Sequence, residues 1–484
     1  SRAGSSPQGW GHSVLQNALL ISKFAPAEEA ARLRSMVKAW ALSDTVRSFV
    51  GNTPLPLLAD AKALMADPDT SPRAELIGHF GFREMDRVVH LRPGYGFGLA
   101  MTSTRIANFE SINGENMRGW HTGDGMTVLY NADLNQYGDN YWPTVDPYRL
   151  PGTTVDTRTL TPPSNSTRAN GQSTCGSYAW TGGAALGTVG AAGMQLSAWG
   201  TTLTAKKSWF MFDDAIVCLG AGITSGDGRT VETIVENRKL LAAGTNAIVA
   251  NGSAVATNLG WSATITNLVW AHLAGNTTNA SIGYYFPQSP TLSALREART
   301  GAWHDINNGG STNLVTRNYF TLWQDHGKSP TNATYAYVLL PGFTASNVAA
   351  YAAEPRTMIL ENSGRAQGVA EPSSGLTAVN FWTAGTNSLG GLTVNKPCSV
   401  VVRSDGLWLE VAVADPTQTN TGAIAVEIAA AASGIVSLDT NVVVQQLAPT
   451  IKLAVSTKAA DGRSARASLF LGKTAETRLD PVAD

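Results

Sequence analysis

The side chains best suited to chemistry in this sequence are gathered in one stretch, residues 108–154. Fifteen consecutive residues within it combine acidic, amide, basic and aromatic types, namely Glu110, Asn113, Glu115, Asn116, Arg118, Trp120, His121 and Asp124. Asn, Asp and Gly disfavour a regular strand, because Asn and Asp bond to the local backbone and Gly leaves the backbone free. The stretch therefore predicts a long ordered loop that presents carboxylate, amide and aromatic groups into a cleft.

Glu110 and Asn113 are the leading candidates for a site within this loop. Taken alone, a Glu and an Asn three residues apart are more often solvated loop residues than parts of a site. Here they stand beside Arg118, Trp120 and His121, which all need defined partners. That density favours a binding or catalytic site over a solvated loop.

Other chemically suggestive residues have simpler structural interpretations. Asp213 and Asp214 lie between two apolar runs, which is typical of a hairpin turn. Four histidines lie in or beside strand-like runs and are predicted to be structural, although the last could also face a cleft: His79, His90, His272 and His326. The sequence contains no GxSxG, no phosphate loop, no HExxH and no CxxC.

Length and composition predict a folded, turn-rich β protein of about two to four domains. The chain has 484 residues, of which 43% are hydrophobic, 15% are charged and 48 are glycine. Its net charge of −1 gives no basic field to recruit nucleic acid or an anionic membrane, and no apolar run is long enough to span a bilayer. Cys175, Cys218 and Cys398 leave open one disulfide with a thiol or three thiols.

Three helices are predicted in residues 1–70, one over 12–22, one after Pro26 and one between Pro54 and Pro68. From residue 73 the pattern changes to alternation with β-branched and aromatic residues, and a turn at Pro93-Gly94. Strand-like runs with turns at close spacing predict a large antiparallel β-sandwich over 71–370. A smaller β domain is predicted over 371–484.

Several segments resemble one known family. NGENMRGWHTGDGMTVLYNADLNQY (113–137), YWPTVDPYRLPGTT (141–154), TIVENR (233–238) and HGKSPTNATYAYVLLPG (326–342) resemble polysaccharide lyase family 8, whose members cleave hyaluronan, chondroitin and xanthan. The resemblance implies an α+β multidomain fold: the end of an α/α toroid at 1–70, then a large antiparallel β-sandwich domain, then a small C-terminal β domain. This chain then resembles the C-terminal two thirds of such an enzyme. The opening SRAGSSPQGW is no signal peptide, so we expect a mature, processed or partial chain.

The resemblance also implies roles for particular residues. The family eliminates across C4–C5 of a uronate with a Tyr and a His, which an upstream toroid segment would supply. Arg2 resembles the second arginine of the family's GRxISR motif and would be a cation beside that Tyr, while Glu110 would hold the arginine and tyrosine in place. Asn113, Asn116 and Trp120 would bind the substrate. No metal or other cofactor is required on this route.

The expected function is therefore eliminative cleavage of hyaluronan or chondroitin to unsaturated disaccharides by a secreted, extracellular enzyme that acts as a monomer. A xanthan-type lyase is the alternative within the same class. A carbohydrate-binding β-sandwich protein without catalysis is the alternative from another class. The expected partners are an acidic polysaccharide and the toroid segment, with neither nucleic acid nor membrane.

Overall fold

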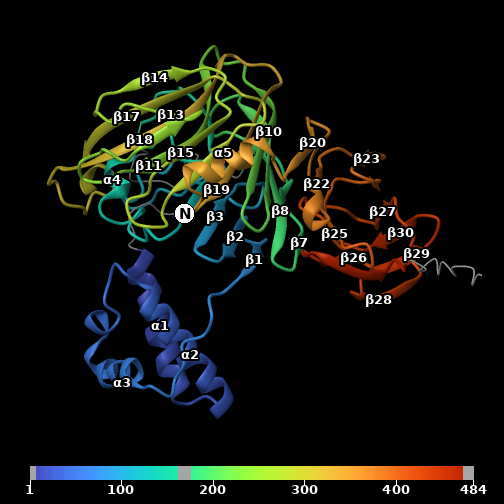
Figure 1. Ribbon diagram of the computed structural model, residues 1–484, viewed down its shortest axis with the longest axis horizontal. Helices are drawn as coiled ribbons and strands as arrows, with labels where there is room; N and C mark the ends of the chain where they lie inside the picture. Colours follow the sequence, from blue (N-terminus) through green and yellow to red (C-terminus); the bar gives the residue numbers. More distant parts are fainter. Residues whose placement is uncertain (1–6, 162–175, 473–484) are drawn as a thin grey trace, which may run out of the picture.

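The computed structural model describes residues 7–161 and 176–472. The first part of these residues forms a small group of helices (Figure 1). These are α1 (Pro7–Ser22), α2 (Ala27–Ser43), the short 3₁₀ turn η1 (Val50–Asn52) and α3 (Leu55–Ala66). Leu15, Leu19, Val37 and Leu64 form their shared core. The three predicted helices are confirmed, but they form no ring, so the toroid stays a prediction. No helix in the described part is long and apolar enough to cross a membrane.

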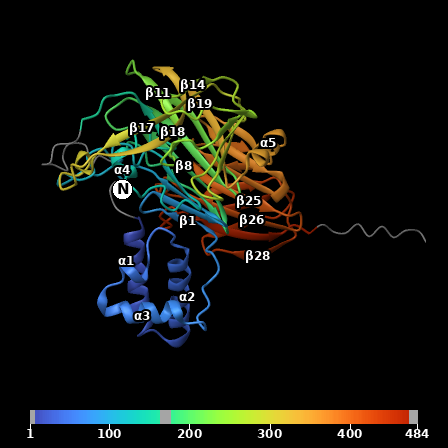
Figure 2. The same ribbon diagram turned by 60° about the vertical axis from the view of Figure 1, so that its left-hand side comes forward.

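An extended segment leads from these helices into the first β-sheet, as Figure 2 shows. The strands are β1 (Gly78–Phe82), β2 (Arg87–Arg92), β3 (Tyr95–Ala100) and β4 (Met126–Tyr130), all antiparallel and paired in chain order. The predicted turn at Pro93-Gly94 joins β2 to β3, and Gly94 adopts a φ of 79°, which suits glycine. The chain between β3 and β4 contains the first part of the predicted loop, residues 108–125, so this sheet carries the two ends of that part. The remainder of the stretch expected to be loop, residues 126–154, contains β4 and a short helix at 141–144, so the expectation of one continuous loop is wrong there.

Two further antiparallel sheets complete the central part. One has ten strands: β6 (Thr181–Gly182), β7 (Ala185–Leu186), β8 (Val189–Ser197), β9 (Thr204–Met211), β10 (Ile216–Thr224), β12 (Ile248–Ala250), β13 (Ser253–Ala254), β15 (Trp270–Leu273), β16 (Ile282–Tyr285) and β19 (Ala333–Pro341). The other has five: β5 (Thr154–Asp156), β11 (Thr230–Lys239), β14 (Ser262–Ile265), β17 (Leu292–Gly301) and β18 (Val315–Lys328). Short helices α4 (Tyr141–Thr144), η2 (Trp303–Asp305) and α5 (Ala345–Ala353) lie between strands.

The C-terminal part is a sandwich of two antiparallel sheets. The seven-stranded sheet contains β20 (Met358–Asn362), β21 (Ala366–Glu371), β22 (Leu376–Phe381), β25 (Cys398–Ser404), β26 (Trp408–Ala414), β28 (Gly434–Leu438) and β31 (Ala465–Phe470). The facing sheet contains β23 (Asn387–Leu389), β24 (Leu392–Val394), β27 (Ile424–Ile428), β29 (Val442–Gln446) and β30 (Ile451–Val455), and the turn η3 (Pro372–Ser374) follows β21. Because β20 and β21 pair with β22, this sheet begins at Met358, before the boundary expected at residue 371.

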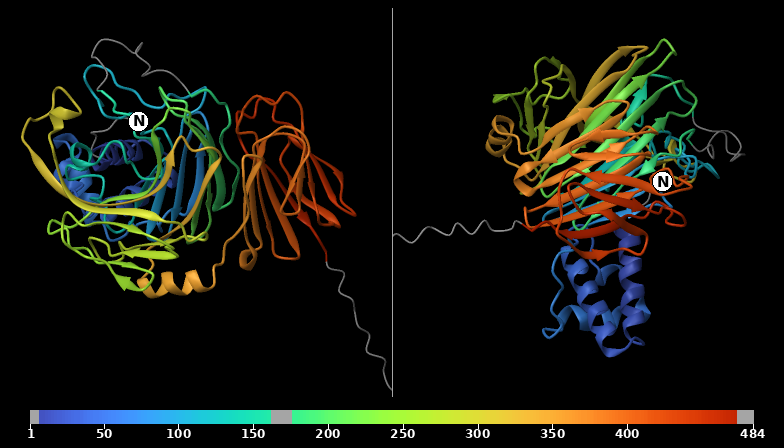
Figure 3. Two further views of the ribbon diagram at one scale, coloured as in Figure 1. Left: turned by 90° about the horizontal axis from the view of Figure 1, so that it is seen from above. Right: turned by 90° about the vertical axis from the view of Figure 1, so that its right-hand side faces the viewer.

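The sheets are stacked in layers, which Figure 3 shows from above. One face of the ten-stranded sheet packs on the four-stranded and five-stranded sheets through residues such as Trp209, Phe97 and Phe320. Its other face packs on α5 and the seven-stranded sheet through residues such as Phe210 and Val348. The middle strands of the ten-stranded sheet, such as β9 and β10, are thus covered on both faces, which gives the loop a rigid support.

The residues interpreted as structural occupy structural positions. Asp213 and Asp214 form the turn between β9 and β10, where Arg92 pairs with Asp213 and Arg356 with Asp214. Three of the histidines are buried: His79, His90 and His272. His326 Nε2 lies 2.8 Å from Thr233 Oγ1 in the neighbouring strand. Cys218 and Cys398 are buried thiols, while Cys175 lies outside the described residues.

Candidate active site

The loop between β3 and β4 folds into a tight hairpin at its centre. The Glu115 N–H donates to Ile112 O at 3.0 Å, and the two residues between them, Asn113 and Gly114, both have positive φ, at 57° and 70°. An Asn-Gly pair with these dihedrals is the turn that suits a two-residue hairpin. Asn113 is therefore exposed at the tip, three residues beyond the partly buried Glu110.

A second segment holds this hairpin from one side. Glu115 pairs with Asn307, and the Met117 N–H donates to Ile306 O at 3.0 Å. The Asn308 N–H donates to Gly114 O at 2.8 Å. The segment after β17 therefore fixes the hairpin through backbone bonds, which leaves the side chain of Asn113 available to a ligand.

Asn116 lies inside the loop instead of on its surface. Its side chain is 1% exposed, and its Nδ2 donates to Glu110 O at 2.6 Å. A Cβ placed on Gly119 would lie 2.3 Å from that same Nδ2, so only glycine fits there. Asn116 thus positions the Glu110 backbone from within, and its predicted contact with substrate is not supported by this geometry.

Trp120 is also buried, at 2% exposure, and its ring lies 5.3 Å from that of Tyr148. A ring this enclosed packs beneath the loop and offers no open face to a sugar. Trp142 is half-buried and lies edge-on to Tyr141 at 5.3 Å, which is a packing contact. The predicted stacking of Trp120 on substrate is therefore not supported either.

A buried carboxylate fixes the far end of the loop. Asp124 is fully buried, and its two oxygens lie 2.6 Å from Asn108 Nδ2, which donates to it, and 2.9 Å from His121 Nδ1. The backbone oxygen of Asp124 accepts from Lys207 Nζ at 3.2 Å. These hydrogen bonds hold residues 108 and 124 close together and so close the loop at its two ends. This buried network is the base of the loop.

Lys207 itself was not predicted as part of the site. Its Nζ also donates to Gly152 O at 2.6 Å, which joins the loop to the LPGTT turn at 150–154. Burial lowers the pKa of Lys207 to about 7, because a charged ammonium loses its water there. The sequence did contain a signal: in a strand that reads Lys206-Lys207-Ser208, alternation turns one of the two lysines inward.

Arg2 lies outside the described residues, so its predicted contact with Glu110 stays a prediction. Arg118, a cation of the same loop, has its Nη1 3.9 Å from Asp305 Oδ2. Among the described tyrosines, those with a shifted pKa are all shifted upward by burial, Tyr130 for example to about 12. A phenol held protonated in this way is a poor base at neutral pH. The tyrosine base expected from the resemblance therefore has no counterpart among these shifted groups.

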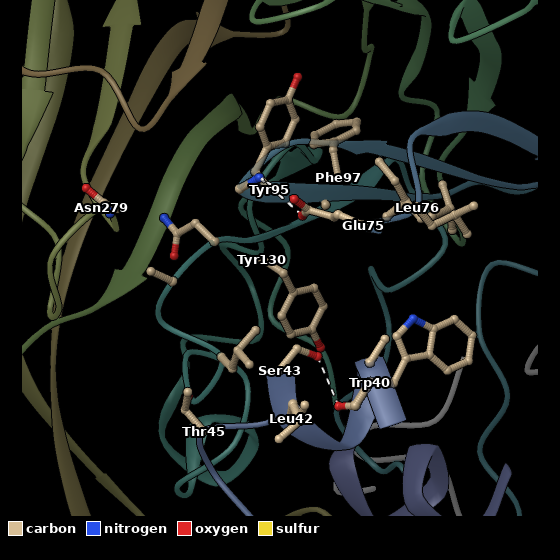
Figure 4. Close-up of a pocket in the computed structure, with 18 of the residues that line it drawn as sticks. Trp40, Leu42, Ser43, Thr45, Glu75, Leu76, Tyr95, Phe97, Tyr130 and Asn279 are labelled. Atoms are coloured by element: carbon tan, nitrogen blue, oxygen red, sulfur yellow. Dashed lines mark hydrogen bonds between the residues drawn. The ribbon is translucent and has the colours of Figure 1, made fainter. Parts of the chain in front are cut away.

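A cavity of about 980 Å³ lies between the end of α2 and the four-stranded sheet (Figure 4). Trp40, Leu76 and Tyr130 line it, and the Glu75 carboxylate accepts from the Gly94 N–H at 3.2 and 3.3 Å. None of the described loop residues predicted for the site lines this cavity. In the described part, no group of three or more His, Cys, Asp and Glu side chains is placed to hold a metal ion.

Comparison with known proteins gives consistent matches along the chain. The super-sandwich domain of polysaccharide lyase family 8 matches residues 77–352, and the C-terminal β-sandwich domain of that family matches 358–424. The xanthan lyase of Bacillus sp. strain GL1 is 47% identical over 99% of this chain and 51% of its own length. The hyaluronate lyase of Thermasporomyces composti is 39% identical over 95% of this chain and 58% of its own length.

Solved structures agree. A Paenibacillus xanthan lyase superposes with a TM-score of 0.92 at 45% identity, covering 97% of this chain and 45% of that one. A Streptomyces coelicolor chondroitin AC lyase superposes with a TM-score of 0.85 at 37% identity, covering 96% of this chain and 59% of that one. The chain thus spans about half the length of the relatives it matches. Since the super-sandwich match alone covers more than half of this sequence, the chain belongs to polysaccharide lyase family 8.

Proposed function

We propose that this chain is the β-structured part of a lyase that cleaves an acidic polysaccharide at its uronate residues by β-elimination. The observation that carries this proposal is the fixed hairpin, which holds Asn113 exposed three residues beyond Glu110 on a closed, buried base. Rigid placement of a few polar groups is what positioning a polymer for elimination requires. Membership of an eliminative family supports the same reaction.

The chemistry assigns a task to each group. Elimination removes the proton on C5 of a uronate and expels the oxygen on C4, and the neighbouring carboxylate must be neutralised before a base can take that proton. The Tyr and His of the toroid segment would supply base and carboxylate partner. Arg2 would lower the pKa of the Tyr phenol, Glu110 would hold that arginine and phenol in place, and Asn113 would hydrogen-bond the sugar.

We propose xanthan as the first candidate substrate, ahead of the hyaluronan or chondroitin favoured by the sequence alone. The xanthan lyase relative is 47% identical to this chain, against 39% for the hyaluronate lyase relative. Hyaluronan and chondroitin form the second candidate class, which the hyaluronate and chondroitin lyase matches support.

The proposal extends to the domains, the location and the oligomeric state of the enzyme. The helices at 1–70 would complete an α/α toroid, whose upstream segment carries the catalytic Tyr and His. The central β domain would follow these helices, and the C-terminal β domain would begin at Met358 instead of the expected residue 371. The enzyme would be secreted to the exterior and act as a monomer.

The proposal is tested by incubating the complete protein with xanthan, hyaluronan and chondroitin and recording the ultraviolet absorbance of the new C4–C5 double bond. We expect absorbance to rise with xanthan, or with one of the other two if the second candidate class is right. Retention of these polymers without any absorbance would instead identify a non-catalytic carbohydrate-binding protein.

A further inference from the structure

A pocket of about 300 Å³ lies where the β1–β2 hairpin meets the chain leading into β31. Four arginines line it, two from each of these segments: Arg83, Arg87, Arg463 and Arg466. The two segments are in contact, since a Cβ on Gly462 would lie 3.6 Å from Arg83 Cβ. Gln418, in the loop after β26, also donates from Nε2 to Arg83 O at 3.3 Å. The pocket therefore stands at the junction of the central and C-terminal sheets, and none of the loop residues discussed above lines it.

The pocket has an excess of positive charge. Asp86 is the one carboxylate that lines it within the described residues, and its Oδ1 is already paired with Arg105 Nη2 at 3.1 Å. Arg105 is outside the lining and is held by the backbone oxygens of Ala179 and Thr181. Arg87 lies beside Asp86, and its Nη1 donates to the backbone oxygens of Met85, Asp86 and Met101. The charges left without a carboxylate in the lining are therefore those on the side of Arg463 and Arg466.

Two of these arginines have no partner of their own. Arg463 and Arg466 are exposed, and in the part of the chain that the structure describes neither guanidinium makes an ion pair or a hydrogen bond. Arg83 has an exposed ion pair with Glu84 at 3.4 Å, but its Nε is buried and has no partner among the described residues. The exposed guanidinium groups of Arg463 and Arg466 are therefore the ones that an anionic ligand would meet.

The same face of the sheet continues from the pocket to an aromatic pair. Side chains alternate along β31, so Arg466, Ser468 and Phe470 point to one face. Trp408 lies opposite Phe470 in β26, with ring centroids 4.8 Å apart, and the two residues are 42% and 36% exposed. Four residues of strand place this pair about 13 Å from Arg466.

We propose that these six residues form an auxiliary binding site for a carboxylate-bearing polysaccharide, here named the junction surface: Arg83, Arg87, Arg463, Arg466, Trp408 and Phe470. Guanidinium groups bind carboxylates through paired hydrogen bonds, and an exposed aromatic pair gives the apolar face of a sugar ring a flat partner. The arginine pocket and the aromatic pair lie on one face of the sheet, with the exposed Glu410 opposite Ser468 between them. An extended chain suits this surface better than a compact anion, because its carboxylates would meet the pocket and its sugar rings the aromatic pair. The site would keep the polymer attached between cuts.

The ligand class rests on the proposed function, whereas the surface itself rests on the geometry alone. Binding is measured by retardation of the full 484-residue chain in gels that contain xanthan, hyaluronan or neutral dextran. We expect retardation by the two acidic polymers, weakening with salt, and none by dextran. Arg463→Gln with Arg466→Gln should reduce affinity about tenfold, and Trp408→Ala should reduce it severalfold.

The matched control is Arg32→Gln with Arg47→Gln, which removes the same charge from exposed arginines of α2 and of the loop that follows it. This variant should bind as wild type. The inference is overturned if the Arg463 and Arg466 double variant binds as wild type, if the control weakens equally, or if neither acidic polymer retards the wild-type chain. Ultraviolet product from the complete protein with no retardation overturns this inference alone. Retardation without any product overturns the proposed lyase function alone.

Discussion

Raising the pH from about 7 to about 9 should stabilise the base of the loop through Lys207. Burial lowers the pKa of this lysine from its ordinary 10.5 to about 7 in the folded protein. Between these two values the unfolded chain binds the proton and the folded chain does not, so the free energy of unfolding rises with pH. The free-energy cost of burying the charged lysine is fully present below pH 7. It disappears as the pH rises to the ordinary lysine pKa of 10.5. Integrating this difference over the interval gives about 2 kcal/mol.

The assay is chemical unfolding of the wild type and of Lys207→Met at several pH values. Buried thiols such as Cys218, whose pKa is raised to about 12 by burial, act in the opposite direction, because only the unfolded chain loses their proton as the pH rises. Both proteins share these groups, so the difference between the two free energies isolates Lys207. The variant also loses the hydrogen bonds to Asp124 O and Gly152 O, which lowers its free energy of unfolding by the same amount at every pH. The pH dependence of the difference between wild type and variant is therefore unaffected by this loss.

The stability advantage of the wild type should therefore grow by about 2 kcal/mol between the two pH values. Lys62, an exposed lysine of α3, provides the matched control: Lys62→Met should show no such slope. A difference between wild type and Lys207→Met that is constant with pH would refute the reasoning, since it would mean that Lys207 carries the same charge in both states.

Three further outcomes follow from the loop and the proposed division of the enzyme. Asn116→Ala should lower the free energy of unfolding by about 2–4 kcal/mol in denaturant titrations, because it removes the hydrogen bond to Glu110 O and places Ala at a φ of 54°. Asn116→Gly should cost less, because glycine adopts that φ without strain. Equal losses in the two variants would contradict the positive-φ argument. Gly119→Ala should reduce turnover of the complete protein, because the added methyl group displaces Asn116. Gly364→Ala is the control, since a methyl group there meets open space and should leave turnover unchanged. Equal turnover in Gly119→Ala and the wild type would show that the hairpin tolerates the methyl group. The 484-residue chain alone should form no unsaturated product, and turnover by it would disprove the assignment of Tyr and His to a separate segment.

Much of the fold follows from local patterns in the sequence. Pro26 and Pro54 each precede a helix, and the apolar positions between them repeat at helical spacing, so α2 and α3 were predicted closely. The Pro93-Gly94 and Asp213-Asp214 turns were found because their residue types have few other uses between alternating strands. β8 was missed because Gly and Ala fill four consecutive positions of its nine and leave no alternation to read there.

The orientation of side chains within the loop could not be read from residue type. Asn116 and Trp120 have the same chemistry as residues that touch a substrate, yet both face inward, because the hairpin folds over Asn116 and Tyr148 packs on Trp120. The exposed position of Asn113 could have been predicted, since an Asn-Gly pair turns outward at a hairpin tip. The inward direction of Lys207 depends on which face of β9 meets the loop, and this is set by strands far apart in the sequence.

The kinetics of Glu110→Gln in the complete protein test the central claim most directly, because the substitution keeps the side-chain shape and removes only the charge. If Glu110 holds the arginine and phenol in place for proton removal, kcat on the uronate polymer should fall by about a hundredfold or more while KM changes little. Unchanged kcat, or a rise in KM with kcat intact, would contradict that role and with it the account of this loop as part of an eliminative active site.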